Sequence, residues 1–110
     1  MMMLRVAASE IEPMIGALDA LVQIAATVGG KIPLFMDSGV RCGADAFKAM
    51  ALGAKAVGIG RPYVYGLALK GEEGVAAVME HLTAELDLTM ALSGARSPAE
   101  ITPDLLQPRT

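Results

Sequence analysis

Short apolar runs alternate with helix-like segments along this chain, and that alternation limits its fold more than any other feature. Residues 13–28 and 44–52 carry apolar side chains at helical spacing, whereas residues 32–36 and 55–60 form apolar runs too short for a helix. The strongest helical period lies in residues 72–95. The order helix, strand, helix, strand, helices is typical of an α/β protein with parallel strands. We therefore expect two parallel strands flanked by helices.

The expected strands are too few for a complete domain. Two strands leave both edges of a sheet open, and a (β/α)₈ barrel takes about 250 residues. The run at 32–36 lacks alternation, which is typical of a strand buried on both faces. With 54% hydrophobic residues, a chain of 110 residues cannot bury all its apolar surface alone. We expect residues 1–110 to be one partial domain that packs against further chain or a partner, with a frayed end from residue 102.

Charge and cysteine content exclude several classes of function. The net charge is −3 and no basic run is present, so neither a nucleic-acid surface nor an anionic-membrane surface is expected. No apolar run reaches the roughly 20 residues that span a bilayer, and the start of the chain lacks the apolar core of a secretory signal. Cys42 is the single cysteine, so no internal disulfide forms, which suits a reducing compartment. We predict a cytoplasmic protein.

Each expected strand ends in a short segment that combines glycine with arginine. Asp37, Gly39 and Arg41 follow the first strand, and Gly60 and Arg61 follow the second. A helix is expected after each segment, so its unpaired N–H groups and positive dipole end would face the same space. Glycine lets the backbone approach a ligand closely, and a planar guanidinium group can bind two phosphate oxygens at once.

Either junction alone is weak support for a binding site, because glycine turns after strands are common and a loop arginine is usually only solvated. Two junctions of the same design on neighbouring strands favour a phosphate site, and barrels often bind phosphate at their last two strands. Asp37 is anionic and cannot bind phosphate itself. It would accept hydrogen bonds from a ligand hydroxyl group or orient a neighbouring arginine.

Longer stretches around both junctions resemble a known family. DSGVR, GAD, KAMALGAKAVGIGRPYVYGLA and LTMALSGARSPAEI together resemble the C-terminal part of the FMN-dependent L-2-hydroxy-acid oxidoreductases, over residues 15–101. DSGVR and GRPYVYGLAL are most similar to the lactate 2-monooxygenase and lactate oxidase branch. The resemblance implies the last βα units of a TIM, or (β/α)₈, barrel with FMN at its C-terminal face. It also implies that the complete enzyme oxidises a lactate-like L-2-hydroxy acid.

The resemblance assigns both junctions to the phosphate and ribityl chain of FMN. The FMN-binding residues that it implies are Asp37, Ser38, Gly39, Val40, Arg41, Gly60 and Arg61. Cys42 lies where the family is variable, so we assign it no role. No metal site is expected.

The family's catalytic segment has no working counterpart in this chain. In the family, a His-Gly-Gly-Arg segment supplies the catalytic base and the arginine that binds the substrate carboxylate. Its four positions fall on Val6, Ala7, Ala8 and Ser9, which can neither act as that base nor pair with a carboxylate. The single histidine, His81, is expected in the middle of a helix and facing solvent. We therefore expect no catalytic residue, and no activity from the chain alone.

Two other interpretations stay open. In one, the chain is a non-catalytic module that completes a split barrel with a partner chain, or that self-associates into a homo-oligomer. In the other, it belongs to a different phosphate-binding barrel, such as a type 2 isopentenyl-diphosphate isomerase or an inosine-monophosphate-dehydrogenase-like protein, which share such glycine turns. The runs GRPYVYGLAL and LTMALSGARS favour the hydroxy-acid family over the latter.

Overall fold

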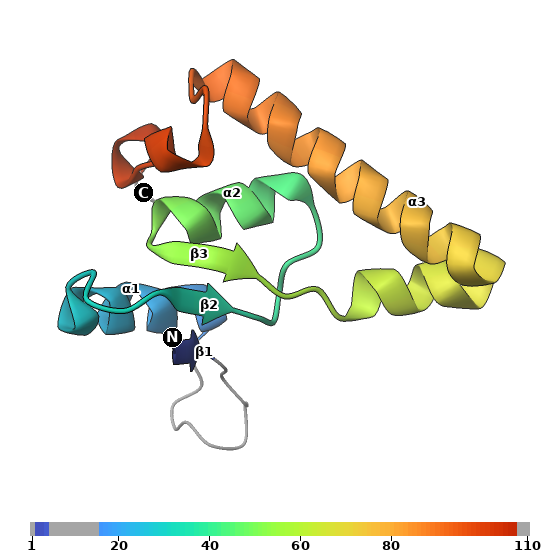
Figure 1. Cartoon of the computed structure of the whole chain (residues 1–110), viewed down its shortest axis with the longest axis horizontal. Helices are drawn as coiled ribbons and strands as arrows, with labels where there is room; N and C mark the ends of the chain where they lie inside the picture. Colours follow the sequence, from blue (N-terminus) through green and yellow to red (C-terminus); the bar gives the residue numbers. More distant parts are fainter. Residues whose placement is uncertain (1, 5–15, 108–110) are drawn as a thin grey trace.

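The computed structural model describes residues 2–4 and 16–107 of the chain. Its helices and strands follow the expected order, with one added strand at the start (Figure 1). They are β1 (Met2–Leu4), α1 (Ala17–Val28), β2 (Leu34–Met36), α2 (Gly43–Ala51), β3 (Ala54–Val57) and α3 (Arg61–Ser93), followed by the short 3₁₀ turns η2 (Pro98–Glu100) and η3 (Pro103–Leu105). Within the described residues, each expected helix and strand is present close to its expected place.

Three parallel strands form one sheet, in the order β1-β2-β3. Leu34 of β2 lies opposite Met2 of β1, and Met36 lies opposite Leu4. The register between β2 and β3 shifts once, between Leu34 and Phe35. The parallel pairing of β2 with β3 confirms the arrangement predicted for the two expected strands. β1 was not predicted, because three residues are too few to show a periodic pattern.

The helices α1 and α2 bury one face of the sheet. Leu34 and Met36 point to that face and are each 3% exposed. They share an apolar cluster with Leu21 of α1 and Ala49 of α2, both fully buried. Phe35 points to the opposite face because side chains alternate along a strand, and it is only partly buried. Among the described residues β2 is therefore buried on one face, and the expectation of burial on both faces is wrong for them.

A second apolar cluster joins α2 to the end of the chain. Phe47 of α2 packs with Ala95 and Ile101, which follow α3. Leu105 and Leu106 also pack against this cluster. The prediction of a frayed end is therefore wrong for the described part of the tail, because these two leucines remove apolar surface from water by packing there.

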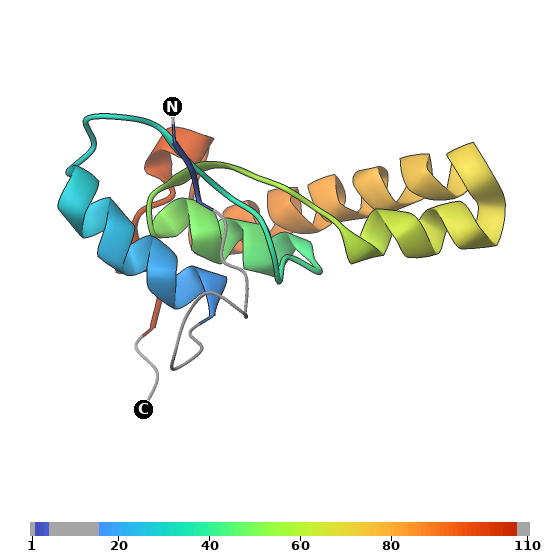
Figure 2. The same ribbon diagram turned by 90° about the horizontal axis from the view of Figure 1, so that it is seen from below.

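The long helix α3 consists of two helical segments that fold back on each other. Lys70 and Gly71 leave helical geometry between the segments, and Gly71 has a φ of 58°. The segments meet where Gly66 and Gly74 touch backbone to backbone, so a Cβ on either residue would collide with the other. Figure 2 shows that this α3 hairpin extends away from the sheet. Two glycines thus set how closely its segments pack.

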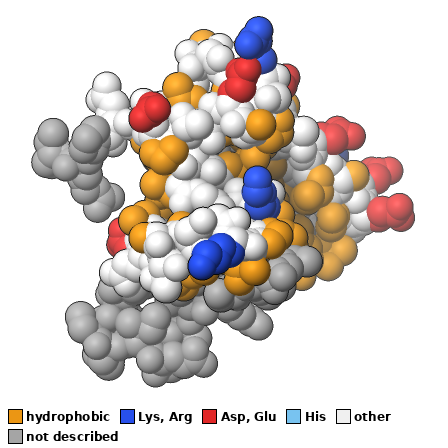
Figure 3. Space-filling view, turned by 60° about the vertical axis from the view of Figure 1, so that its left-hand side comes forward, with side chains coloured by type: hydrophobic (Ala, Val, Ile, Leu, Met, Phe, Trp, Pro, Cys, Tyr) orange, Lys and Arg blue, Asp and Glu red, His pale blue; other side chains and the backbone are white. Residues whose placement is uncertain are grey.

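Large hydrophobic side chains stay exposed on both segments of the α3 hairpin. Tyr65, Leu69 and Leu92 are 62%, 83% and 80% exposed. At the end of the molecule away from the tip of the hairpin, hydrophobic side chains also reach the surface between scattered charged ones (Figure 3). This exposure agrees with the expected surplus of apolar residues. In the described part of the chain, no helix combines the length and hydrophobicity needed to cross a membrane.

Candidate functional site

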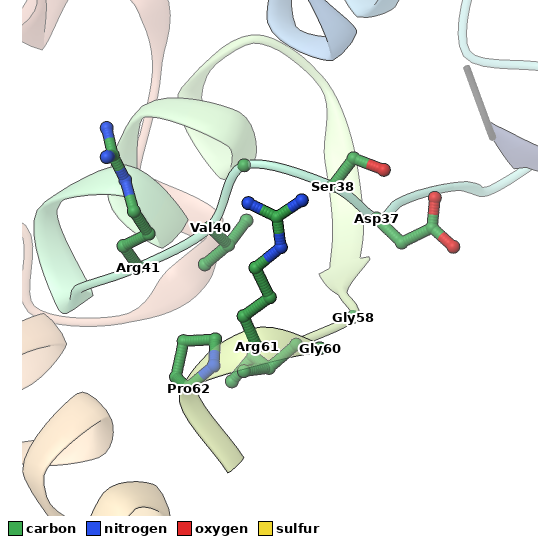
Figure 4. A pocket seen from close by; sticks show the side chains of 10 residues that line it. Asp37, Ser38, Val40, Arg41, Gly58, Gly60, Arg61 and Pro62 are labelled. Atoms are coloured by element: carbon green, nitrogen blue, oxygen red, sulfur yellow. The ribbon is translucent and has the colours of Figure 1, made fainter. Parts of the chain in front are cut away.

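All seven residues that the family resemblance assigns to FMN binding line one hollow at the carboxyl ends of β2 and β3 (Figure 4). The hollow has a volume of about 500 Å³, and Gly58, Ile59 and Pro62 complete its wall. The two strands are parallel and adjacent, so their carboxyl ends meet at the same edge of the sheet, where open α/β sheets bind ligands. The structure thus brings together the two junctions that the sequence predicted to act together.

The junction between β2 and α2 is a strained turn held by a buried anchor. Ser38 and Gly39 have φ angles of 85° and 80°. Glycine adopts this left-handed geometry without steric cost, whereas serine rarely does. Val40 is 3% exposed and belongs to the same core cluster as Met36. The turn therefore presents Ser38 and Gly39 to the hollow while Val40 fixes it to the core.

The junction between β3 and α3 is rich in glycine and open. The Gly58 N–H donates a hydrogen bond to the Met36 carbonyl at 2.7 Å, which ties this junction to the end of β2. Gly60 is the N-cap residue of α3. A Cβ built on Gly60 or on Gly39 meets no atom within 4 Å. Because both glycines line the hollow, the side chains that they lack leave space there for a ligand.

Two guanidinium groups and one carboxylate give the hollow its charge. Figure 4 shows the Arg61 side chain extending from the start of α3 toward the turn at Ser38 and Val40. Arg41 lies beyond Val40, and both arginines are exposed. The Asp37 carboxylate is turned away from Arg61, and its Oδ1 atom is buried. The positive charge therefore lies where a ligand can reach it.

Asp45, which lies in the GAD motif but was assigned no role, contacts the first junction from α2. Its Oδ2 atom accepts a hydrogen bond from the Arg41 backbone N–H at 3.0 Å. Asp45 lies in the first turn of α2, where the positive end of the helix dipole favours a carboxylate. An acidic residue three positions after the N-cap residue, here Cys42, is half of a capping-box pattern. That spacing could have indicated a contact between Asp45 and this turn, although a capping box uses the N–H of the N-cap residue and the observed donor is the preceding residue, Arg41.

The remaining candidate residues lie outside the hollow or outside the described part of the chain. His81 is exposed on α3, as expected, and does not line the hollow. Cys42 is partly exposed at the start of α2 and does not line it either. Residues 6–9, which fall at the positions of the family's catalytic segment, lie outside the described residues. Within residues 2–4 and 16–107, no group of three or more His, Cys, Asp or Glu side chains could hold a metal ion.

The hollow fits the phosphate and sugar-alcohol end of FMN. Guanidinium groups and exposed glycine backbone can surround a phosphate group, and the Asp37 and Ser38 side chains can hydrogen-bond hydroxyl groups. The described wall of the hollow includes no aromatic side chain that would stack on the flavin ring. The residues present therefore suit the phosphate and sugar-alcohol end of the cofactor. The described wall offers no aromatic surface for its ring.

Comparison with known proteins identifies the family of the chain. The model of the FMN-dependent dehydrogenase family matches residues 8–108. The chain is 51% identical over 98 residues to 2-hydroxyacid oxidase 2 of Rattus norvegicus, which covers 89% of this chain and 28% of that relative. It is 52% identical over 88 residues to an L-lactate oxidase of Lysinibacillus sphaericus, which covers 80% of this chain and 23% of that relative.

The fold also matches solved structures. An active mutant of (S)-mandelate dehydrogenase matches with a TM-score of 0.83 and 41% identity, over 90% of this chain and 28% of the other. The chain thus spans well under a third of each relative that it matches here. It belongs to the family of FMN-dependent dehydrogenases, whose cofactor is FMN, and its helices and parallel strands are the C-terminal part of that family's (β/α)₈ barrel.

Proposed function

We propose that this chain binds the phosphate and ribityl chain of FMN as the cofactor-binding part of a 2-hydroxy-acid oxidoreductase. The hollow shared by the two glycine–arginine junctions carries the proposal. Membership of the family supplies the cofactor, and relatives named 2-hydroxyacid oxidase and L-lactate oxidase supply the substrate class, a lactate-like L-2-hydroxy acid. When bound, FMN supplies the acceptor for the hydride that leaves the hydroxyl-bearing carbon of that acid.

The residues of the hollow have separate tasks under this proposal. Arg41 and Arg61 bind phosphate oxygens through their guanidinium groups. Gly39 and Gly60 leave room for the phosphate close to the backbone. Asp37 accepts hydrogen bonds from ribityl hydroxyl groups. Its carboxylate is turned away from Arg61, which favours this task over orienting that arginine (Figure 4).

We expect the isolated chain to bind FMN weakly. Two arginines and a few N–H groups, at roughly 1.5–3 kcal/mol per charge-assisted hydrogen bond, contribute about 6–10 kcal/mol before costs. Association itself costs roughly 4–15 kcal/mol, and no aromatic side chain in the described wall stacks on the ring. The purified chain should therefore be colourless. A sub-micromolar affinity, measured by the quenching of FMN fluorescence, would contradict the proposal that the chain holds only one end of the cofactor.

We also expect no turnover of lactate by the chain alone. Residues 6–9 carry neither a histidine nor an arginine, and His81 lies outside the hollow. General-base catalysis requires a base within hydrogen-bond reach of the proton that it removes. The assay is oxidation of L-lactate with excess FMN and an artificial electron acceptor, and turnover above that of free FMN would refute the expectation.

Nuclear magnetic resonance tests the phosphate assignment directly, because it detects weak binding residue by residue. Amide spectra of the full chain are recorded with FMN, with inorganic phosphate and with ribitol, each at millimolar concentration. FMN and phosphate should shift the amides of residues 38–41 and 60–61, whereas ribitol, which has no charge, should shift them much less. Equal shifts with all three ligands, or shifts confined to other residues, would count against the assignment.

A second candidate function is completion of a split barrel with a partner chain. The exposed apolar side chains of the α3 hairpin and the partly buried Phe35 on the uncovered face of β2 favour it. Co-expression with the earlier strands of a family relative is the test. A yellow complex that oxidises lactate would support a split enzyme, and two chains that fail to co-purify would refute it. A homo-oligomer would instead appear as a larger mass of the chain alone in light scattering.

A cytoplasmic location stays a prediction from composition. The names of matched proteins include a peroxisomal (S)-2-hydroxyacid oxidase and a monotopic membrane protein, (S)-mandelate dehydrogenase. The family therefore occupies more than one location. Fractionation of native cells, followed by detection of the chain with an antibody, tests the prediction.

A further inference from the structure

We infer that Asp45 is a positioning residue of this site, which fixes the backbone of Arg41 and whose charge opposes binding of an anion in the hollow. The inference rests on the proposed binding of the FMN phosphate in the hollow. It begins with the hydrogen bond that the Arg41 backbone N–H donates to Asp45 Oδ2 at 3.0 Å. Arg41 lines the hollow and Asp45 does not, so Asp45 acts on the site through Arg41.

This hydrogen bond fixes the Arg41 backbone relative to α2. Val40, the preceding residue, is buried and fixes the same stretch of backbone to the core. The helix that carries Asp45 is itself fixed, because Gly43 lies directly against the backbone of α3 at Leu86. Arg41 has a long and flexible side chain, and a fixed starting point reduces the number of positions that its guanidinium group samples.

The charge of Asp45 also distinguishes the two helices that begin at the hollow. Its carboxylate lies in the first turn of α2, where it already interacts with the positive end of the helix dipole and repels a second anion. The first turn of α3 contains no acidic residue, and Gly60 and Arg61 at its start line the hollow. Removal of the Asp45 charge should therefore favour binding of an anion in the hollow.

Two substitutions separate the hydrogen bond from the charge. Asp45→Asn keeps an oxygen that can accept the Arg41 N–H and removes the charge, whereas Asp45→Ala removes both. Asp19→Asn is the matched control, because Asp19 lies in the first turn of α1 and does not line the hollow. Each full-length variant is measured for hydrogen exchange of the Arg41 amide and for affinity toward inorganic phosphate and FMN by amide chemical shifts.

Asp45→Ala should expose the Arg41 amide to exchange about tenfold faster and weaken both ligands about threefold, since a hydrogen bond to a charged group is lost. Asp45→Asn should leave that exchange near the value of the unchanged protein. It should tighten anion binding about twofold at low salt, an effect that fades as salt screens the charge. Asp19→Asn should alter neither quantity.

The outcomes separate this inference from the proposed function. An Arg41 amide that exchanges equally fast in Asp45→Ala and in the unchanged protein overturns the positioning role. Weaker anion binding by Asp45→Asn overturns the inferred repulsion between the Asp45 carboxylate and the anion. If the unchanged protein binds neither phosphate nor FMN, the proposed function fails, while the exchange measurement still decides whether Asp45 holds Arg41. If Asp45→Ala does not fold, Asp45→Ser, whose acceptor is shorter, replaces it in the exchange measurement.

Discussion

The two junctions that line the hollow differ in how they are held. The β2–α2 junction contains a serine in left-handed geometry, a buried valine at position 40 and a side-chain hydrogen bond from α2. The β3–α3 junction has glycines at positions 58 and 60, and no acidic residue in the helix turn that follows. The first junction is therefore fixed by its contacts, and the second is left open.

This difference indicates separate roles for the two junctions, one in the shape of the hollow and one in binding the charge of the ligand. The fixed β2–α2 junction defines the wall of the hollow, and its helix dipole is already matched by Asp45. The open β3–α3 junction provides Arg61 and a helix start without a competing carboxylate. Changes at the first junction should therefore act mainly on stability, and changes at the second mainly on ligand affinity.

The largest expected effect is on stability, from Gly43→Ala at the first junction. A Cβ on Gly43 would collide with the backbone of α3 at Leu86, and backbone cannot move aside as a flexible side chain can. We expect a loss of about 3 kcal/mol or more in the free energy of unfolding, at the upper end for overpacking. Gly60→Ala, the matched change at the second junction, meets no atom and should change stability by less than about 0.5 kcal/mol.

Urea unfolding followed by circular dichroism measures both variants. Gly60→Ala should also weaken phosphate binding, because its Cβ projects into open space beside the ligand. Similar losses of stability in the two variants would show that the junctions do not differ as described.

The parts of the fold that the sequence predicts are those with a local signal. The strands β2 and β3 could be recognised as short apolar runs, and the helix between them from its period. Their junctions could be paired because the carboxyl ends of adjacent parallel strands meet at one edge. The hollow lined by Asp37 and Arg61 follows from these two inferences together.

The features that escaped prediction depend on contacts between distant residues. The packing of Leu105 and Leu106 depends on the position of α2, which no pattern in the tail records. No prediction was made for the break in α3 at Gly71, and the close approach of Gly66 to Gly74 exists only once the segments fold together. The contact between Asp45 and Arg41 had a weak signal in the capping spacing alone.

The next effect in size is on affinity and compares the two arginines. Arg61→Ala should weaken phosphate and FMN binding about tenfold, because its guanidinium group extends into the hollow above a helix start without an acidic residue. Arg41→Ala should weaken binding only about threefold, because the Arg41 side chain lies beyond Val40 and apart from the Arg61 guanidinium group (Figure 4). Amide titrations measure both.

The corresponding lysine variants are the controls, since they keep the charge and lose the planar fork. Arg61→Lys should recover part of the affinity lost in Arg61→Ala. A larger loss of affinity from Arg41→Ala than from Arg61→Ala would reverse the roles proposed for the two junctions.

The smallest expected effect is a gain in stability from Ser38→Gly. Left-handed geometry costs a residue with a side chain roughly 1–2 kcal/mol, and Ser38 has a φ of 85°. Glycine removes that cost but loses roughly 0.5–1 kcal/mol more backbone entropy on folding, so we expect a net gain of about 0.5 kcal/mol in urea unfolding. Ser38→Ala keeps the strain and removes only the hydroxyl group, and should give no gain. If alanine stabilised the protein as much as glycine does, the hydroxyl group rather than the backbone would be the source of the cost, and the β2–α2 junction would not be the strained one.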